Sequence, residues 1–150
     1  MKRLLSAIGF WLTYPLVWVY LRIGTRTRVL IVVGDSVLLA KGWLGLDQWG
    51  LPGGGVHKRE DPADGAAREV KEETGISLPT TSLKFFYKAR ANYKGLQFDY
   101  SCYYAELSKR PPLQKQSLEI AQLEWVPLKD VTQANTTAEA YRAVQHWLKR

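Results

Sequence analysis

Three glutamates close together in the sequence have the types and spacing of a divalent metal site. Glu69, Glu72 and Glu73 are spaced i, i+3, i+4, so on a helix their carboxylates share one face and repel one another unless a cation lies between them. No lysine or arginine follows Glu69 or Glu72 four residues later, where Glu73 and Ile76 stand. A hard divalent cation binds carboxylate oxygens and would relieve the repulsion. The spacing therefore favours a metal site over a solvated helix face.

The segment that carries these glutamates has the start and stop signals of a helix. Asp61 is a good N-cap and Pro62 suits the first helical position, where its missing N–H is harmless. Gly75 can take the left-handed conformation that ends a helix. These signals predict a helix over Pro62 to Thr74, with small residues facing a sheet and the glutamates on the opposite side. The glycines at 53–55, just before it, allow a main-chain carbonyl and a phosphate to approach the same metal.

The order of these residues resembles the signature of the Nudix hydrolases at every position. The pattern reads Gly54-x5-Glu60-x7-Arg68-Glu69-Val70-x-Glu72-Glu73-x-Gly75-Ile76, and the later segment Glu119-Ile120-x4-Trp125 is also similar to the family. The resemblance implies an α/β/α sandwich with a mixed β-sheet and hydrolysis of a P–O–P bond.

The resemblance also implies roles for individual residues. Mg²⁺ or Mn²⁺ would be held by Glu69 and Glu73, by Glu72 directly or through water, and by the carbonyl of Gly53. Glu60 and Arg68 resemble the pair that orients these carboxylates. The metal would lower the pKa of a bound water that attacks phosphorus. The general base is either a glutamate of the signature or Glu119, for which an exposed loop acid is the competing interpretation.

The substrate is less well indicated than the reaction. Trp49, Phe98 and Tyr100 are candidates to stack on a base, although aromatic residues with strand alternation are more often core. Tyr93 lies at a spacing similar to that of a tyrosine in diadenosine-polyphosphate hydrolases. We expect a nucleoside triphosphate or similar small nucleotide. The alternatives are a dinucleoside polyphosphate, a prenyl or lipid diphosphate cleaved at a membrane, and a Nudix-fold binding module without activity.

Composition indicates one cytoplasmic domain with a distinct N-terminus. The chain of 150 residues is long enough for one core, and its single cysteine, Cys102, excludes an internal disulfide and fits a reducing compartment. Of the formal charge of +7, the first 28 residues carry +5, so no nucleic-acid-binding surface is expected on the domain. Residues 4–21 form an uncharged run with basic flanks, which predicts membrane association through a hydrophobic helix. The alternative is a helix packed on the domain or on a second copy of it, as in a homodimer.

The rest of the chain, from 25 to 150, predicts the Nudix domain with an α+β fold. A hairpin is expected where two short β-branched or apolar runs flank Gly34-Asp35. Longer strands, a short strand and a closing helix follow. The predicted strands are Val29 to Val33, Val37 to Ala40, Leu83 to Ala91, Gln97 to Leu107 and Leu123 to Val126, and the closing helix is Thr137 to Lys149.

Overall fold

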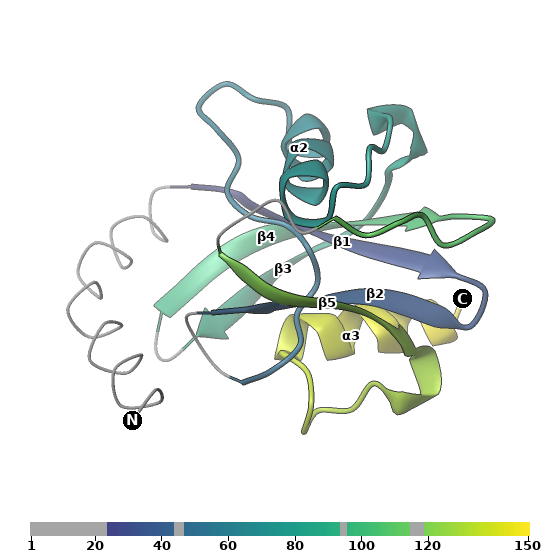
Figure 1. Cartoon of the computed structure of the whole chain (residues 1–150). Helices are drawn as coiled ribbons and strands as arrows, with labels where there is room; N and C mark the ends of the chain where they lie inside the picture. The colour runs from purple at the N-terminus through teal and green to yellow at the C-terminus, as the bar shows by residue number, and fades with distance from the viewer. Residues whose placement is uncertain (1–23, 44–46, 94–95, 115–118) are drawn as a thin grey trace.

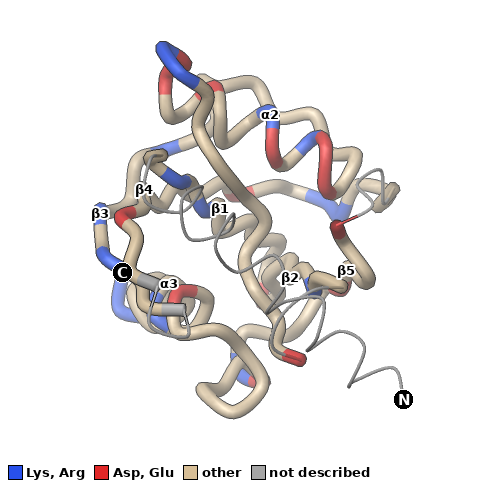
Figure 2. The backbone as a smooth tube through the Cα atoms, turned by 90° about the vertical axis from the view of Figure 1, so that its left-hand side faces the viewer, with Lys and Arg blue, Asp and Glu red and all other residues tan. Residues whose placement is uncertain are grey.

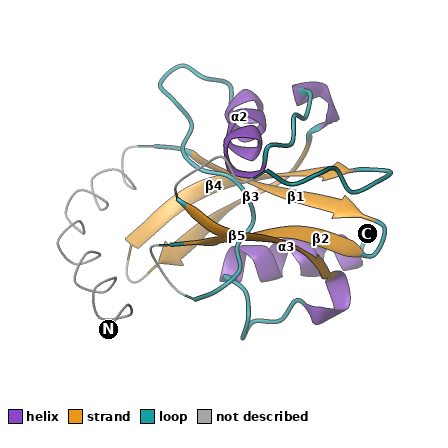
Figure 3. Ribbon diagram, viewed as in Figure 1, coloured by secondary structure: helices purple, strands orange, loops and turns teal. Residues whose placement is uncertain are grey.

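One mixed β-sheet lies between two helices (Figures 1 and 3). The structure, a computed structural model, describes residues 24–43, 47–93, 96–114 and 119–150. The sheet order is β3-β4-β1-β2-β5; β1 and β4 are parallel and the other neighbours antiparallel. The strands are β1 (Arg26–Val33), β2 (Ser36–Gly42), β3 (Lys84–Tyr93), β4 (Leu96–Glu106) and β5 (Ile120–Pro127). The helices are α2 (Pro62–Thr74) and α3 (Ala138–Leu148), with short 3-10 turns at Thr80–Ser82 and Leu128–Asp130. The predicted α+β sandwich is confirmed.

The central strand β1 is apolar on both sides because a helix covers each face of the sheet. Val29 and Ile31 belong to the core beneath α2, and Leu30 and Val32 to the core beneath α3; all four are 0% exposed. A strand buried on both faces reads as a continuous hydrophobic run rather than an alternating one. This double burial holds β1 rigidly next to the glutamate helix.

Helix α2 has the ends that its sequence predicts. The Asp61 carboxylate accepts a hydrogen bond from the N–H of Ala63, and Gly75 closes the helix with a φ of 77°. Ala66 and Val70 are buried against the sheet, so the face with the glutamates is turned away from the core. Helix α3 begins after Thr137, whose side chain accepts from the N–H of Ala140.

The two strands of the first hairpin separate soon after their turn. β1 and β2 pair directly only at Val32 with Val37 and Val33 with Ser36. Further along, residues 50–56 enter the space between them. The N–H of Val29 donates to the carbonyl of Pro52 and that of Thr27 to the carbonyl of Gly54, each at 2.9 Å. The glycine segment is thereby held in the plane of the sheet, beside α2.

The N-terminal hydrophobic helix and its membrane association concern residues outside the described part of the chain. Within the described part, no helix is both long and apolar enough to cross a membrane. Strand β5 is longer than predicted, because it pairs with β2 from Ser36 to Gly42.

Candidate active site

Arg68 of α2 forms a bidentate ion pair with Glu60, which lies in the loop before the helix. The Nε of Arg68 donates to Oε1 of Glu60 at 2.9 Å and its Nη2 to Oε2 at 3.0 Å. The N–H of His57 donates to the same carboxylate at 2.7 Å. The hydrogen bonds from Arg68 and then from His57 lower the pKa of Glu60 to about 2. Glu60 therefore stays ionised at neutral pH and holds the guanidinium in a fixed plane.

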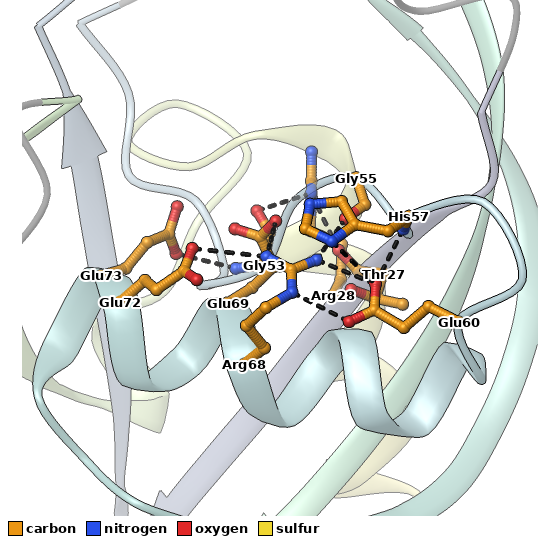
Figure 4. A network of polar contacts seen from close by, with 10 residues as sticks. All are labelled: Thr27, Arg28, Gly53, Gly55, His57, Glu60, Arg68, Glu69, Glu72 and Glu73. Atoms are coloured by element: carbon orange, nitrogen blue, oxygen red, sulfur yellow. Dashed lines mark hydrogen bonds and ion pairs between the residues drawn. The ribbon is translucent and has the colours of Figure 1, made fainter.

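The other nitrogen of this guanidinium contacts two of the three clustered glutamates (Figure 4). Nη1 of Arg68 lies 3.0 Å from Oε1 of Glu69 and 3.3 Å from Oε2 of Glu72. Nη2 also donates to the carbonyl of Gly55 at 2.9 Å. The prediction that no cation of the helix compensates these carboxylates is wrong, because Arg68 stands four residues before Glu72 and one before Glu69. Figure 2 shows acidic and basic positions interleaved along α2.

Glu73 has a different environment from the other two glutamates. Its Oε2 accepts a hydrogen bond of 2.8 Å from the N–H of Gly53. Burial is the main cause that raises the pKa of Glu73 to about 7. The Gly53 N–H and Arg28 oppose the shift, and the negative charges of Glu69 and Glu119 add to it. Without a bound cation, Glu73 is therefore only about half ionised at neutral pH.

Two glycines allow the loop to lie against these carboxylates. A Cβ on Gly54 would be only 2.5 Å from Oε2 of Glu69, and a Cβ on Gly53 would collide with the carbonyl oxygen of Thr27. Gly53 also has a φ of 137°, which side chains disfavour. The Gly53 carbonyl accepts a hydrogen bond from Nη1 of Arg28 at 3.0 Å. The two main-chain groups of Gly53 thus face a carboxylate and a guanidinium.

The donor set suits a hard divalent cation. Within the described residues, no three acidic, histidine or cysteine side chains already form a metal-binding group. The carboxylates of Glu69 and Glu73 nevertheless border two successive glycines, Gly54 and Gly53, and Glu69 and Glu72 share one guanidinium nitrogen. Carboxylate and carbonyl oxygens are the ligands of Mg²⁺ and Mn²⁺, and a cation here would stabilise the ionised form of Glu73.

The remaining predicted site residues fall in different places. Glu119 is exposed in the turn just before β5, close enough for its charge to act on Glu73. Trp49 is partly buried beneath the Lys41 ammonium, 5.3 Å from its ring centre. Phe98 is 6% exposed and Tyr100 only 1%, and both belong to the core beneath α3. A stacking role for Tyr100 does not fit this structure, because its ring is enclosed. The backbone of Tyr93 pairs with Leu96, and its side chain lies outside the described atoms.

Arg28 contacts the glycine loop of the site, and the sequence did not indicate this role. It was counted with the basic N-terminus, yet its guanidinium reaches Gly53 from β1. The available signal was a cation directly before the apolar run Val29 to Val33 of the same strand. A charged side chain is costly at such a position without polar partners.

Comparison with known proteins agrees with this architecture. The NUDIX domain family model matches residues 21–148, and the chain belongs to this family. Diphosphoinositol polyphosphate phosphohydrolase 2 of Rattus norvegicus is 52% identical over 42 residues, covering 28% of this chain and 24% of that protein. RNA pyrophosphohydrolase of Bartonella quintana is 30% identical over 100 residues, covering 55% of this chain and 58% of that protein. The chain thus spans less than two thirds of the length of either relative.

Among solved structures, a MutT NUDIX hydrolase from Burkholderia pseudomallei superposes with a TM-score of 0.71 at 23% identity. The match covers 82% of this chain and 96% of that one, so the two share a fold.

Proposed function

We propose that this chain is a metal-dependent hydrolase that cleaves the P–O–P bond of a diphosphate-containing substrate. The observation that carries the proposal is the environment of Glu73: a carboxylate with a raised pKa, held by the N–H of Gly53 and next to Glu69. The charge of Arg28 offsets this shift only in part, and a bound cation would favour the ionised form of Glu73. In a family whose relatives include two phosphohydrolases, that cation is a divalent metal.

Some residues of the site would bind the metal, and others would orient its ligands. Glu69, Glu72 and Glu73, with the Gly53 carbonyl, would hold Mg²⁺ or Mn²⁺. When bound, the metal supplies charge neutralisation of the diphosphate and acidification of a water molecule. Arg68, fixed by Glu60, sets the orientation of Glu69 and Glu72.

The proton acceptor for the attacking water is a carboxylate near Glu73. We favour Glu119, because it is exposed and its charge acts on Glu73. A glutamate of α2 is the alternative. A general base must lie within hydrogen-bond reach of the water, directly or through one further water.

For the substrate, we propose a nucleoside triphosphate or a related small nucleotide. The relatives named above act, by their names, on diphosphoinositol polyphosphates and on RNA, so both ligand types belong in the comparison. A binding module without activity is disfavoured, because all the carboxylates of the signature are present. The hypothesis of a prenyl diphosphate substrate rests only on the uncharged run at residues 4–21. Membrane association through this run stays a prediction.

The test is a hydrolysis screen of the full chain with Mg²⁺ and with Mn²⁺. It compares nucleoside triphosphates, dinucleoside polyphosphates, 5′-triphosphorylated RNA, diphosphoinositol polyphosphates and prenyl diphosphates. We expect phosphate or diphosphate release that stops when EDTA is added. Release that continues unchanged in EDTA, or none from any substrate, would contradict the proposal.

A further inference from the structure

The loop before α2 contains a turn with three exposed basic residues, His57, Lys58 and Arg59. Two hydrogen bonds close this turn. The N–H of Glu60 donates to the carbonyl of His57 at 3.1 Å, and the N–H of His57 donates to the carboxylate of Glu60 at 2.7 Å. Within the described residues, Lys58 and Arg59 form no ion pair or side-chain hydrogen bond. The turn thus presents two cations to solvent, and Figure 2 shows basic positions at the tip of this loop.

Arg59 has a backbone conformation that residues with a side chain rarely adopt. Its φ is 70°, and no other non-glycine residue in the described part of the chain has a positive φ. Arg59 is the third residue of the four-residue turn, a position where glycine takes a positive φ without steric cost. An arginine therefore stands where glycine would fit the backbone better. Residues held in such conformations are concentrated at functional sites, so the Arg59 side chain is a candidate for a ligand contact.

The loop runs beside the helix face that carries the carboxylates, from Gly53 to the basic turn (Figure 4). At one end, Gly53 contacts Glu73, and at the other end, Glu60 pairs with Arg68. Arg68 and Glu73 are five residues apart on α2, which corresponds to about 7 to 8 Å along the helix axis. A substrate whose reacting phosphate lies at Glu73 can therefore extend along the loop to the turn.

Building on the diphosphate hydrolysis proposed above, we propose that Lys58 and Arg59 bind a phosphate group of the substrate beyond the diphosphate that is cleaved. Ammonium and guanidinium groups donate charge-assisted hydrogen bonds to phosphate oxygens. The closed turn fixes the backbone of Arg59 before binding, so less conformational freedom is lost when the ligand binds. The preferred substrate would carry additional phosphates, either as phosphomonoesters on a small molecule or as the phosphodiesters of a nucleotide chain.

A purely structural role for the turn makes different predictions. If the turn only held Glu60 in place, its variants would weaken Mn²⁺ binding through the loss of the contact between Glu60 and Arg68. A ligand role instead predicts unchanged Mn²⁺ affinity and weaker binding of long polyanions. Arg59→Gly separates the two roles sharply, because glycine suits the positive φ and should preserve the melting temperature while the charge is lost.

Lys129 offers a matched control for the loss of one exposed cation. It lies in the 3-10 turn Leu128–Asp130, where the N–H of Leu128 donates to the carbonyl of Asp35 in the turn between β1 and β2. That turn is at the end of the sheet away from the glycine loop. Lys129→Ala therefore changes the net charge equally without altering the loop.

The experiment measures, by calorimetry with saturating Mg²⁺, the binding of three probes that contain no cleavable P–O–P bond. Methylenediphosphonate is the short probe, and inositol hexakisphosphate and a 5′-phosphorylated RNA tetranucleotide are the long probes. We expect Lys58→Ala and Arg59→Gly each to weaken binding of a long probe about three- to tenfold. Methylenediphosphonate should bind all variants equally, because it does not reach the turn. Arg59→Lys should retain most of the affinity, and Lys129→Ala should bind as the wild type does.

The two long probes distinguish the sources of the additional phosphate. A loss confined to inositol hexakisphosphate assigns the turn to phosphomonoesters, and a loss confined to the RNA assigns it to phosphodiesters. Wild-type affinity of Lys58→Ala and Arg59→Gly for both long probes would overturn the proposal. An equal loss in Lys129→Ala, an equal loss with methylenediphosphonate, or a wild type that binds neither long probe would overturn it as well.

Failure of the proposed function is recognised separately. Wild-type protein that hydrolyses no substrate in the screen contradicts catalysis. Binding of the three probes requires no hydrolysis and still reports on Lys58 and Arg59.

Discussion

At the scale of single residues, the site contains one carboxylate whose ionised form is costly, Glu73, beside charged groups that are paired with an opposite charge. Glu60 and Arg68 form an ion pair, whereas burial of Glu73 makes its ionised form costly. Binding sites commonly retain such groups because the ligand supplies the missing partner. The site should therefore lower the free energy of unfolding of the metal-free protein.

We predict that Glu73→Gln stabilises the metal-free protein at pH 8 by about 1 to 3 kcal/mol. Folding raises the pKa of Glu73 from its ordinary value of 4.5 to about 7, so the folded state binds the proton more tightly. The wild type should accordingly lose stability as pH rises from about 4.5 to 7, and the glutamine variant should lack this loss. Urea unfolding in EDTA at pH 5 and pH 8 measures it. Equal pH dependence in both proteins would show that Glu73 is not desolvated.

Arg68→Ala should weaken Mn²⁺ binding about ten- to a hundredfold, because Glu69 and Glu72 lose the group that orients them. Excess metal should restore much of the activity. Lys71→Ala is the matched control, because it removes an exposed cation of the same helix. Activity that no metal concentration restores in Arg68→Ala would instead indicate direct contact with the substrate.

At the scale of elements, the glycine loop must enter the sheet between β1 and β2 for the site to exist. Gly53 has a positive φ, and its Cα faces the carbonyl oxygen of Thr27. We predict that Gly53→Ala lowers the free energy of unfolding by about 1 to 3 kcal/mol, from strain and displacement of the loop. Gly24→Ala is the control, since no atom of the described residues lies within 4 Å of its added methyl group. Equal stability of the two variants in urea would contradict the proposed constraint.

The elements that the sequence predicts well are those whose signals are local. The bounds of α2 follow from Asp61, Pro62 and Gly75, all within one turn of its ends. The insertion of residues 50–56 between two strands depends on pairing with distant residues, and no local pattern announces it. Tyr100 was ambiguous because β4 is covered on both faces, so alternation does not separate core from ligand contacts.

The residues of the site likewise differ in whether their contacts are local in the sequence or long-range. The contacts of Arg68 with Glu60 and the glutamates join residues of one signature, and the resemblance anticipated that group. Arg28 enters from β1, 25 positions before Gly53. Its place is set by the parallel pairing of β1 with β4, which brings it beside Phe98, and such long-range register could not be read from the sequence.

At the scale of the whole molecule, the described part of the chain forms the complete sandwich, with the candidate site built entirely from residues 27 to 119. We predict that removal of residues 1–24 leaves a folded domain that retains hydrolysis and leaves the membrane fraction, because the uncharged run at 4–21 is lost. Fractionation of cells that express both forms, with activity assays on each, checks this. Full-length protein absent from the membrane fraction, or a truncated form that does not fold, would favour a packed helix.

The most direct test of the account compares Mg²⁺-dependent turnover of wild type and Glu73→Gln on the best substrate from the screen. Loss of a metal ligand that stabilises transition-state charge should reduce kcat by about a hundredfold or more, with the fold preserved. A Glu139→Gln variant, altered at a half-buried position of α3 on the other side of the sheet, should keep wild-type turnover. The result that would contradict the account is near wild-type kcat for Glu73→Gln at saturating Mg²⁺.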